Sequence, residues 1–183
     1  MFNHKRYILL AVLCLASTLS LAQRSGPVAF NLPDHGRLLL AVPAAWDVEI
    51  RPVQGRAPPT LHLSPRNGKT FHVMLTPMWT ADAATPFPDD ESVRAKVSAA
   101  ATEAQLQSVE QTLTVLELSG KADHGYYFTV TDRDPKPEEW KYLTQGIIRI
   151  GPVDLAFSVL TNDGQDSVIK SALAMLGGAI HES

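Results

Sequence analysis

Two histidines, His62 and His72, have a spacing that can place their imidazoles side by side on a β-hairpin. Between them lies Arg66-Asn67-Gly68, and both Asn and Gly tolerate the positive φ angles of a tight turn. If these three residues form the loop, with Gly68 in the left-handed conformation, His62 lies directly opposite His72. This register also satisfies the hydrophobic pattern, because it gathers the apolar residues of both strands on the other face: Leu61, Leu63, Phe71, Val73 and Leu75.

Opposed imidazoles of this kind can bind a metal ion. Their Cβ atoms would lie about 5 Å apart, and a carboxylate or a third histidine beside them would complete a site for Zn²⁺ or Cu²⁺. No third ligand is identifiable by spacing. The simpler interpretation, which we favour, is a pair of polar residues on a solvated or helix-covered sheet face. The alternative is a metal-binding protein or metallohydrolase that uses zinc or copper at His62 and His72.

The segment from Asp132 to Trp140 is the most distinctive loop of the sequence. Two prolines stiffen it, charges of both signs crowd it, and a tryptophan stands at its end. Loops of this composition can present recognition surfaces, so we predict a binding site for a protein or a small ligand. The alternative is an ordinary hairpin connection whose tryptophan packs in the core. The predicted binding residues are Asp132, Asp134, Lys136, Glu138, Glu139, Trp140 and Tyr142.

The sequence signatures of common enzyme classes are missing. The chain has no Gly-x-Ser-x-Gly nucleophile elbow, no His-Glu-x-x-His zinc motif, no phosphate-binding glycine loop and no dinucleotide fingerprint. The three consecutive carboxylates from Asp89 to Glu91 are explained by the capping and charging of a helix start. We therefore expect an accessory or binding domain without catalytic residues.

Residues 1–22 have the pattern of a secretory signal peptide. A basic start is followed by an apolar run, and Ser20 and Ala22 are small residues where a signal peptidase requires them. We therefore expect the mature chain to be periplasmic or secreted. Cleavage would remove Cys14, the only cysteine of the sequence, so thiol chemistry and cysteine metal sites are not expected.

Charge and hydropathy narrow the classes of partner. Removal of the two basic residues of the signal leaves 14 basic against 19 acidic side chains, a net charge near −5 with histidine neutral. Nucleic-acid binding normally needs a basic patch, so no nucleic-acid partner is expected. No second apolar run approaches the roughly 20 residues that span a bilayer, so no membrane span is expected after cleavage. We predict a protein partner in the cell envelope.

Hydrophobic periodicity predicts a single α+β domain over residues 35–183, after an irregular arm over 23–34. The expected order is β-β-β-β-α-β-β-β-β-α, with one largely antiparallel sheet and two main helices packed on it. The first helix is expected from about Glu91 to Glu110, and the second follows the polar turn at 162–166. The expected strands cover residues 37–42, 46–50, 60–64, 70–75, 112–118, 126–132, 142–150 and 153–161.

Two resemblances follow from these patterns. The strand over 38–42 ends in Pro43-Ala44-Ala45-Trp46, and a hairpin, a long helix, further strands and a terminal helix come after it. This resembles the PsbP/DcrB-like α/β sandwich over roughly Phe30 to Ile180, and the resemblance implies a non-catalytic accessory or binding module. The chain is also similar to uncharacterised secreted proteobacterial proteins, a likeness that implies no known activity. Its motifs are Gly125-Tyr126-Tyr127-Phe128, Thr131-Asp132, Pro135-Lys136-Pro137, Thr144-Gln145-Gly146 and Leu160-Thr161-Asn162-Asp163.

Overall fold

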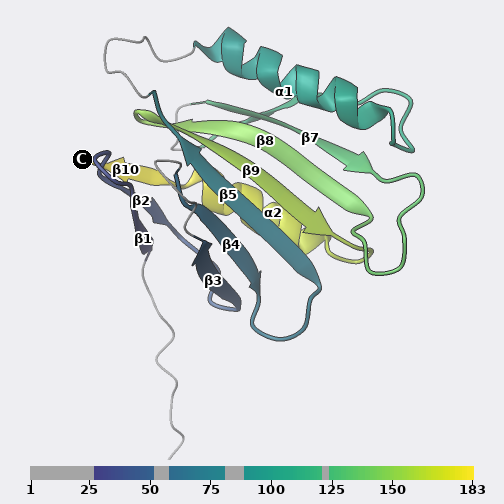
Figure 1. Ribbon diagram of the computed structural model, residues 1–183, viewed down its shortest axis with the longest axis horizontal. Helices are drawn as coiled ribbons and strands as arrows, with labels where there is room; N and C mark the ends of the chain where they lie inside the picture. Colours follow the sequence, from purple (N-terminus) through teal and green to yellow (C-terminus); the bar gives the residue numbers. More distant parts are fainter. Residues whose placement is uncertain (1–26, 52–57, 81–88, 121–123) are drawn as a thin grey trace, which may run out of the picture.

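A computed structural model describes residues 27–51, 58–80, 89–120 and 124–183 of the chain. The predicted signal peptide and the first residues of the predicted arm lie outside the described residues. The described chain combines a large antiparallel sheet, a small second sheet and helices on both faces of the large one (Figure 1). The predicted α+β class with a mostly antiparallel sheet is therefore confirmed.

The larger sheet has seven strands in the order β3-β4-β5-β9-β8-β7-β6, and every neighbouring pair is antiparallel. Side chains alternate between its two faces along each strand, so each strand contributes to two different environments. The strands are β3 (Trp46–Arg51), β4 (Thr60–Pro65), β5 (Phe71–Met78), β6 (Leu116–Leu118), β7 (Gly125–Thr131), β8 (Tyr142–Ile150) and β9 (Val153–Thr161).

A second sheet of three strands joins the two ends of the described chain. Its order is β1-β2-β10, where β1 is Val28–Asn31, β2 is Arg37–Leu40 and β10 is Ile180–Glu182. The predictions of a single sheet and of an irregular arm over 23–34 were therefore wrong for these residues. The physical reason is burial: Phe30 of β1 is only 3% exposed in the main core, and its backbone groups are satisfied by pairing with β2.

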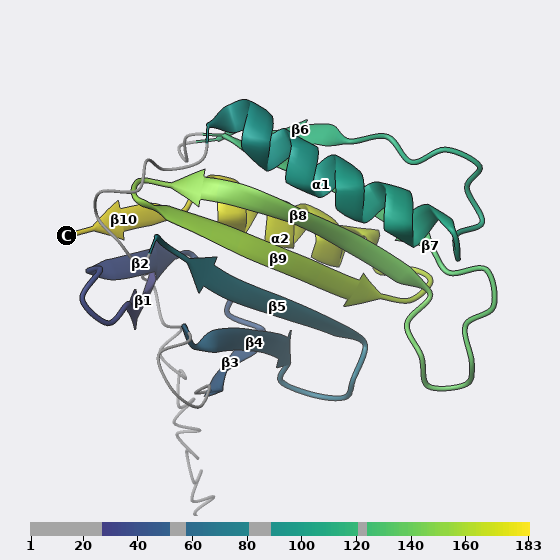
Figure 2. The ribbon, with the colours of Figure 1, turned by 45° about the horizontal axis from the view of Figure 1, so that its top comes forward.

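The helices α1 (Asp90–Gln105) and α2 (Asp166–Gly177) cover opposite faces of the larger sheet (Figures 1 and 2). Val97 of α1 packs against Phe128 of β7 in one hydrophobic cluster. On the other face, Leu176 of α2 belongs to the larger cluster, together with the inner residues of the small sheet. Within the described chain α1 lies over β7 and β8. No helix of the described residues lies over the same face of β3, β4 and β5 (Figure 1).

Local sequence signals placed several elements correctly. Strands β8 and β9 have the predicted limits, and their two-residue turn at Gly151-Pro152 has Gly151 at a φ of 58°, in the left-handed region that glycine tolerates. At the start of α1, the side chain of Asp89 accepts a hydrogen bond from the amide of Ser92 at 2.8 Å. The predicted capping of this helix by carboxylates is therefore confirmed.

The C-terminal end of α1 was predicted wrongly. The helix stops at Gln105 instead of continuing to Glu110. The amides of residues 106–108 close a tighter turn on carbonyls three residues earlier, and the chain then bonds to β7. The amide of Val109 donates to the carbonyl of Thr131 at 2.9 Å, and Ser108 forms an isolated bridge with Asp132. This return of the chain to the sheet creates one wall of the site described next.

Candidate binding cleft

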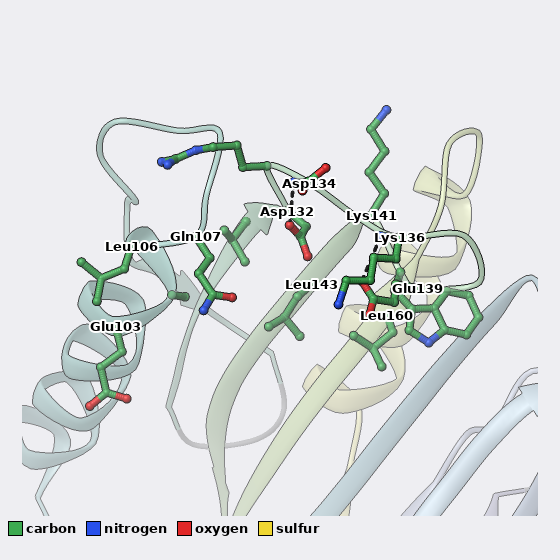
Figure 3. Close-up of a pocket in the computed structure, with 14 residues that line it drawn as sticks. Glu103, Leu106, Gln107, Asp132, Asp134, Lys136, Glu139, Lys141, Leu143 and Leu160 are labelled. Atoms are coloured by element: carbon green, nitrogen blue, oxygen red, sulfur yellow. Dashed lines mark hydrogen bonds between the residues drawn. The ribbon is translucent and has the colours of Figure 1, made fainter.

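A cleft of about 830 Å³ lies between the C-terminal end of α1 and the connection 132–141 that joins β7 to β8. Figure 3 shows Glu103, Leu106 and Gln107 on the helical side, with Leu143 and Leu160 on the strands between the two walls. The complete lining is Glu103, Ala104, Leu106, Gln107, Val130, Asp132, Arg133, Asp134, Lys136, Glu139, Trp140, Lys141, Leu143 and Leu160.

The connection that forms one wall is ordered by hydrogen bonds of its own. Asp132 accepts a bond from the amide of Asp134 at 2.9 Å, a turn geometry to which the short Asp side chain is suited. Lys136 and Glu139 exchange two bonds, one from the Lys136 amide to the Glu139 carboxylate and one from the Glu139 amide to the Lys136 carbonyl, both at 2.9 Å. The wall therefore has a defined conformation before any ligand arrives.

The turn that follows α1 is held against this connection. The Ser108 side chain is fully buried, and its hydroxyl donates to the carbonyls of Gln105 at 3.1 Å and Glu110 at 2.7 Å. The guanidinium of Arg133 reaches across and donates twice to the Ser108 carbonyl, from Nε at 3.0 Å and from the terminal nitrogen at 2.7 Å. These bonds fix the distance between the two walls of the cleft.

Glu110 makes a further link between the turn and β7. Its two carboxylate oxygens accept bonds from the amide of Thr131 at 3.0 Å and from the Thr131 hydroxyl at 2.6 Å. Burial acts to raise the pKa of this carboxyl group, but the two bonds from Thr131 favour the charged form and outweigh burial. The net result is a pKa below the usual value for Glu110.

The floor of the cleft is apolar and its outer rim is charged. Val130 is buried, whereas Leu143, Leu160 and Trp140 are half-buried. Leu106, on the helical wall, is 79% exposed and adds open apolar surface beside this floor. A ligand with an apolar body could therefore cover surface that is now in contact with water.

The structure brings most of the predicted loop residues together. Asp132, Asp134, Lys136, Glu139 and Trp140 line the cleft, and their role in binding stays a prediction. Glu138 is exposed, has a positive φ of 75° and lies outside the lining. Tyr142 turns towards the β9–α2 connection, where its hydroxyl donates to Asp163 at 2.6 Å.

The helical wall was missed by the sequence analysis. Glu103, Leu106 and Gln107 were assigned to an uninterrupted helix, so nothing connected them with a loop about 30 residues further along. One signal was available: Leu106 falls outside the apolar stripe that Val97 and Ala101 define, so a continued helix would leave it exposed.

The histidine pair lies on β4 and β5, on the face of the sheet over which α1 packs further along. Nδ1 of His62 is 2.8 Å from Nε2 of His72, and the two ring centroids are 5.0 Å apart. The predicted register was wrong by two residues, since His62 pairs with Met74 and the loop covers residues 66–70. A two-residue shift keeps every side chain on its face, so the hydrophobic pattern could not distinguish the two registers. Gly68 does have the predicted positive φ, at 80°.

The surroundings of the pair favour neutral imidazoles. Burial lowers the pKa of both His62 and His72, and the nearby Arg51 lowers both further. Glu49 lies opposite His62 on β3, but its carboxylate is bound by Arg51 at 3.0 and 3.1 Å. In the described part of the chain, no group of three or more His, Cys, Asp or Glu residues could hold a metal ion. Zinc or copper at His62 and His72 stays a prediction.

Comparisons with known proteins add little. No protein-family model and no curated protein matches the chain. A crystal structure from Bacteroides thetaiotaomicron VPI-5482 is similar with a TM-score of 0.48 at 9% sequence identity, over 80% of this chain and 45% of that one. This chain therefore spans less than half the length of that protein. The PsbP/DcrB-like resemblance stays a prediction. No helix among the described residues is long and apolar enough to cross a membrane.

Proposed function

We propose that this protein is a non-catalytic binding module of the cell envelope, and that it holds a segment of a partner protein in the cleft between α1 and the connection 132–141. The observation that carries the proposal is the convergence of five predicted loop residues with the end of α1 around one apolar floor. The predicted signal peptide supports the location. The absence of enzyme motifs from the sequence supports a binding role.

The exposed apolar side chains around the cleft favour a protein segment over a small molecule. Leu106 is 79% exposed and Val109, in the same turn, is 59% exposed. Small-ligand sites usually enclose most of the ligand surface, whereas protein interfaces combine an apolar centre with a polar rim. Trp140 has the residue type that most often anchors such interfaces. An open cleft with these side chains therefore suits an extended or helical segment.

The ordered walls lower the cost of binding. Arg133 joins the connection 132–141 to the turn after α1 through the Ser108 carbonyl, and Glu110 joins that turn to β7, so little backbone freedom is left to lose. Ordering of loops and side chains is one of the main terms that oppose association. A preformed cleft can therefore bind a short segment with useful affinity.

Site-specific photocross-linking in the cell envelope tests this proposal. The chain is expressed with its own signal, and a photoreactive amino acid replaces Leu106 on the rim of the cleft. The matched control carries it at Ile50, which is 53% exposed on β3 at the other edge of the sheet. We expect a discrete cross-linked protein from position 106 only, and its loss in the Trp140→Ala variant. Equal cross-linking from both positions, or none from position 106, would contradict the proposal.

A further inference from the structure

The positive and the negative side chains that line the cleft do not offer equal charge to a ligand. Seven lining residues are ionisable, and they comprise more carboxylates than cations. The carboxylates are Glu103, Asp132, Asp134 and Glu139, and the cations are Arg133, Lys136 and Lys141. Which charges a bound ligand meets depends on which of these groups already have partners.

Two of the three cations have partners within the protein. The ammonium of Lys141 lies 2.9 and 3.0 Å from the two carboxylate oxygens of Asp163, a residue outside the lining. This pair leaves Lys141 with little net charge to offer a ligand. The guanidinium of Arg133 donates two bonds to the Ser108 carbonyl, which orient the side chain and leave its positive charge. The exposed ammonium of Lys136 has no hydrogen bond or ion pair with another described residue. Arg133 and Lys136 therefore oppose the four lining carboxylates, and an excess of two negative charges remains.

The carboxylates keep their capacity for a ligand. Asp132 and Glu139 each accept one backbone amide, which orders the side chain without neutralising its charge. No hydrogen bond or ion pair joins the side chain of Glu103 or Asp134 to another described residue. These two carboxylates come from opposite walls of the cleft, Glu103 from α1 and Asp134 from the connection (Figure 3).

The end of α1 adds to the negative potential. The C-terminal end of a helix carries a partial negative charge, which a basic side chain in the last turn usually offsets. The last turn of α1 contains no basic residue, and Glu103 and Ala104 in that turn line the cleft. A cationic group beside this helix end would be stabilised by both the dipole and the Glu103 carboxylate.

We propose that the segment bound in the cleft carries an arginine or a lysine next to a bulky apolar side chain. This inference rests on the proposed function and specifies its ligand. The apolar side chain would cover Leu143 and Leu160, and the cation would lie at the end of α1, beside the Glu103 carboxylate. The indole of Trp140 offers an additional face for a cation. Since the charges lie on an open rim, they decide which segment binds more than how tightly it binds.

Titrations followed by NMR test this inference with matched peptides. The probes are the blocked tripeptides Leu-Arg-Leu, Leu-citrulline-Leu and Leu-Glu-Leu, which differ only in the central side chain. Citrulline is a neutral analogue of arginine with nearly the same shape, and glutamate reverses the charge. We expect amide shifts at the end of α1 and in the connection 132–141. Affinity for the arginine peptide should exceed that for the citrulline peptide about fivefold, as a contribution of about 1 kcal/mol from exposed ion pairs implies. The glutamate peptide should bind most weakly.

Salt and charge variants provide the controls. The advantage of the arginine peptide should disappear between about 0.1 M and 1 M NaCl, over which the Debye length falls from about 10 Å to about 3 Å. The double variant Glu103→Gln, Asp134→Asn should bind the arginine and citrulline peptides equally. Glu117→Gln, an exposed change on β6 outside the lining, should leave the difference intact.

Two results would overturn the inference. If the arginine and citrulline peptides bind the cleft equally, the cation preference is wrong, but the proposed binding site stands. If no peptide shifts the amides of the cleft residues, the ligand chemistry is wrong, and cross-linking at position 106 decides separately whether the cleft binds a partner at all.

Discussion

Nδ1 of His62 lies 2.8 Å from Nε2 of His72, across the neighbouring strands β4 and β5. One ring must donate a proton to this bond and the other must accept it, so at least one imidazole is neutral when the bond forms. The bond is lost when both rings are protonated, and the two positive charges then repel. The pair therefore links the stability of the β4–β5 hairpin to pH.

We expect the folded state to lose stability as the pH falls below about 6.5, the usual pKa of histidine. Burial depresses the folded-state pKa of both His62 and His72, so the unfolded chain binds more protons in this window and stability rises with pH. The groups facing the pair are Glu49, which opposes the depression, and Arg51, which reinforces it.

Urea unfolding at a series of pH values between about 5 and 8 measures this effect around the histidine pKa. The double variant His62→Gln, His72→Gln should flatten the dependence, whereas Lys69→Gln, an exposed change in the loop between β4 and β5, should leave it unchanged. A wild-type curve that is flat over this range would contradict the role assigned to the pair.

Replacement of Ser108 by Ala should destabilise the fold and loosen the cleft. The Ser108 hydroxyl is buried and donates to two carbonyls, and its loss should cost about 1 to 3 kcal/mol in the free energy of unfolding. Ser98→Ala is the matched control, because that hydroxyl bonds the Arg94 carbonyl on the exposed side of α1. Its effect should stay within about 0.5 kcal/mol. Equal urea midpoints for the two variants would count against the structural role of Ser108.

In the Glu110→Gln variant, the stability of the fold should depend less strongly on pH in the acidic range. The pKa of Glu110 lies below its usual value. The bonds to Thr131 therefore stabilise the fold fully when the pH is above the usual pKa of a glutamate. This stabilisation is lost as the pH falls through the folded-state pKa. Thermal unfolding between about pH 3 and 6, the range around the pKa of a glutamate, should show a shallower decline in the variant. An unchanged slope would mean that other carboxylates govern acid unfolding.

Gly146→Ala should disrupt the centre of the sheet. A Cβ atom at position 146 would collide with the carbonyl oxygen of Tyr126 on β7 and approach the ring of Phe157 on β9 to 2.7 Å. We expect a loss of at least about 3 kcal/mol or a failure to fold, since a buried clash between strands cannot be relieved by solvent. Gly164→Ala provides the comparison, because its Cβ would meet no atom within 4 Å and the cost there is only that of a positive φ. Similar expression and unfolding midpoints for both variants would disprove the expected clash.

Elements with local causes were predictable from the sequence. The hairpin from Tyr142 to Thr161 depends on β-branched and aromatic strands around Gly151-Pro152, and its limits were predicted correctly. The start of α1 depends on Asp89, whose side chain caps an amide only three residues away. Such signals lie within a few residues of one another, so the order of neighbouring residues contains all of the information they need.

The sequence also predicted binding residues in the loop, because of their charges, prolines and tryptophan. It did not predict the cleft that these residues line. Its helical wall exists because the turn at Ser108 bonds to Asp132 and Arg133 on a distant connection, and this stops α1 at Gln105. The apolar pattern could not reveal these hydrogen bonds, which form only when the helix lies on the sheet.

The α+β class, the antiparallel hairpins and the shared face of His62 and His72 follow from the order of the residues, because alternation and turn residues act over short distances. The tertiary structure alone decided the rest. It shifted the histidine register by two residues, which the period of a strand permits. It also recruited Val28–Asn31 and Ile180–Glu182 into a second sheet and brought Leu106 to face the connection 132–141. These outcomes depend on contacts between distant segments, whose energies no local pattern contains.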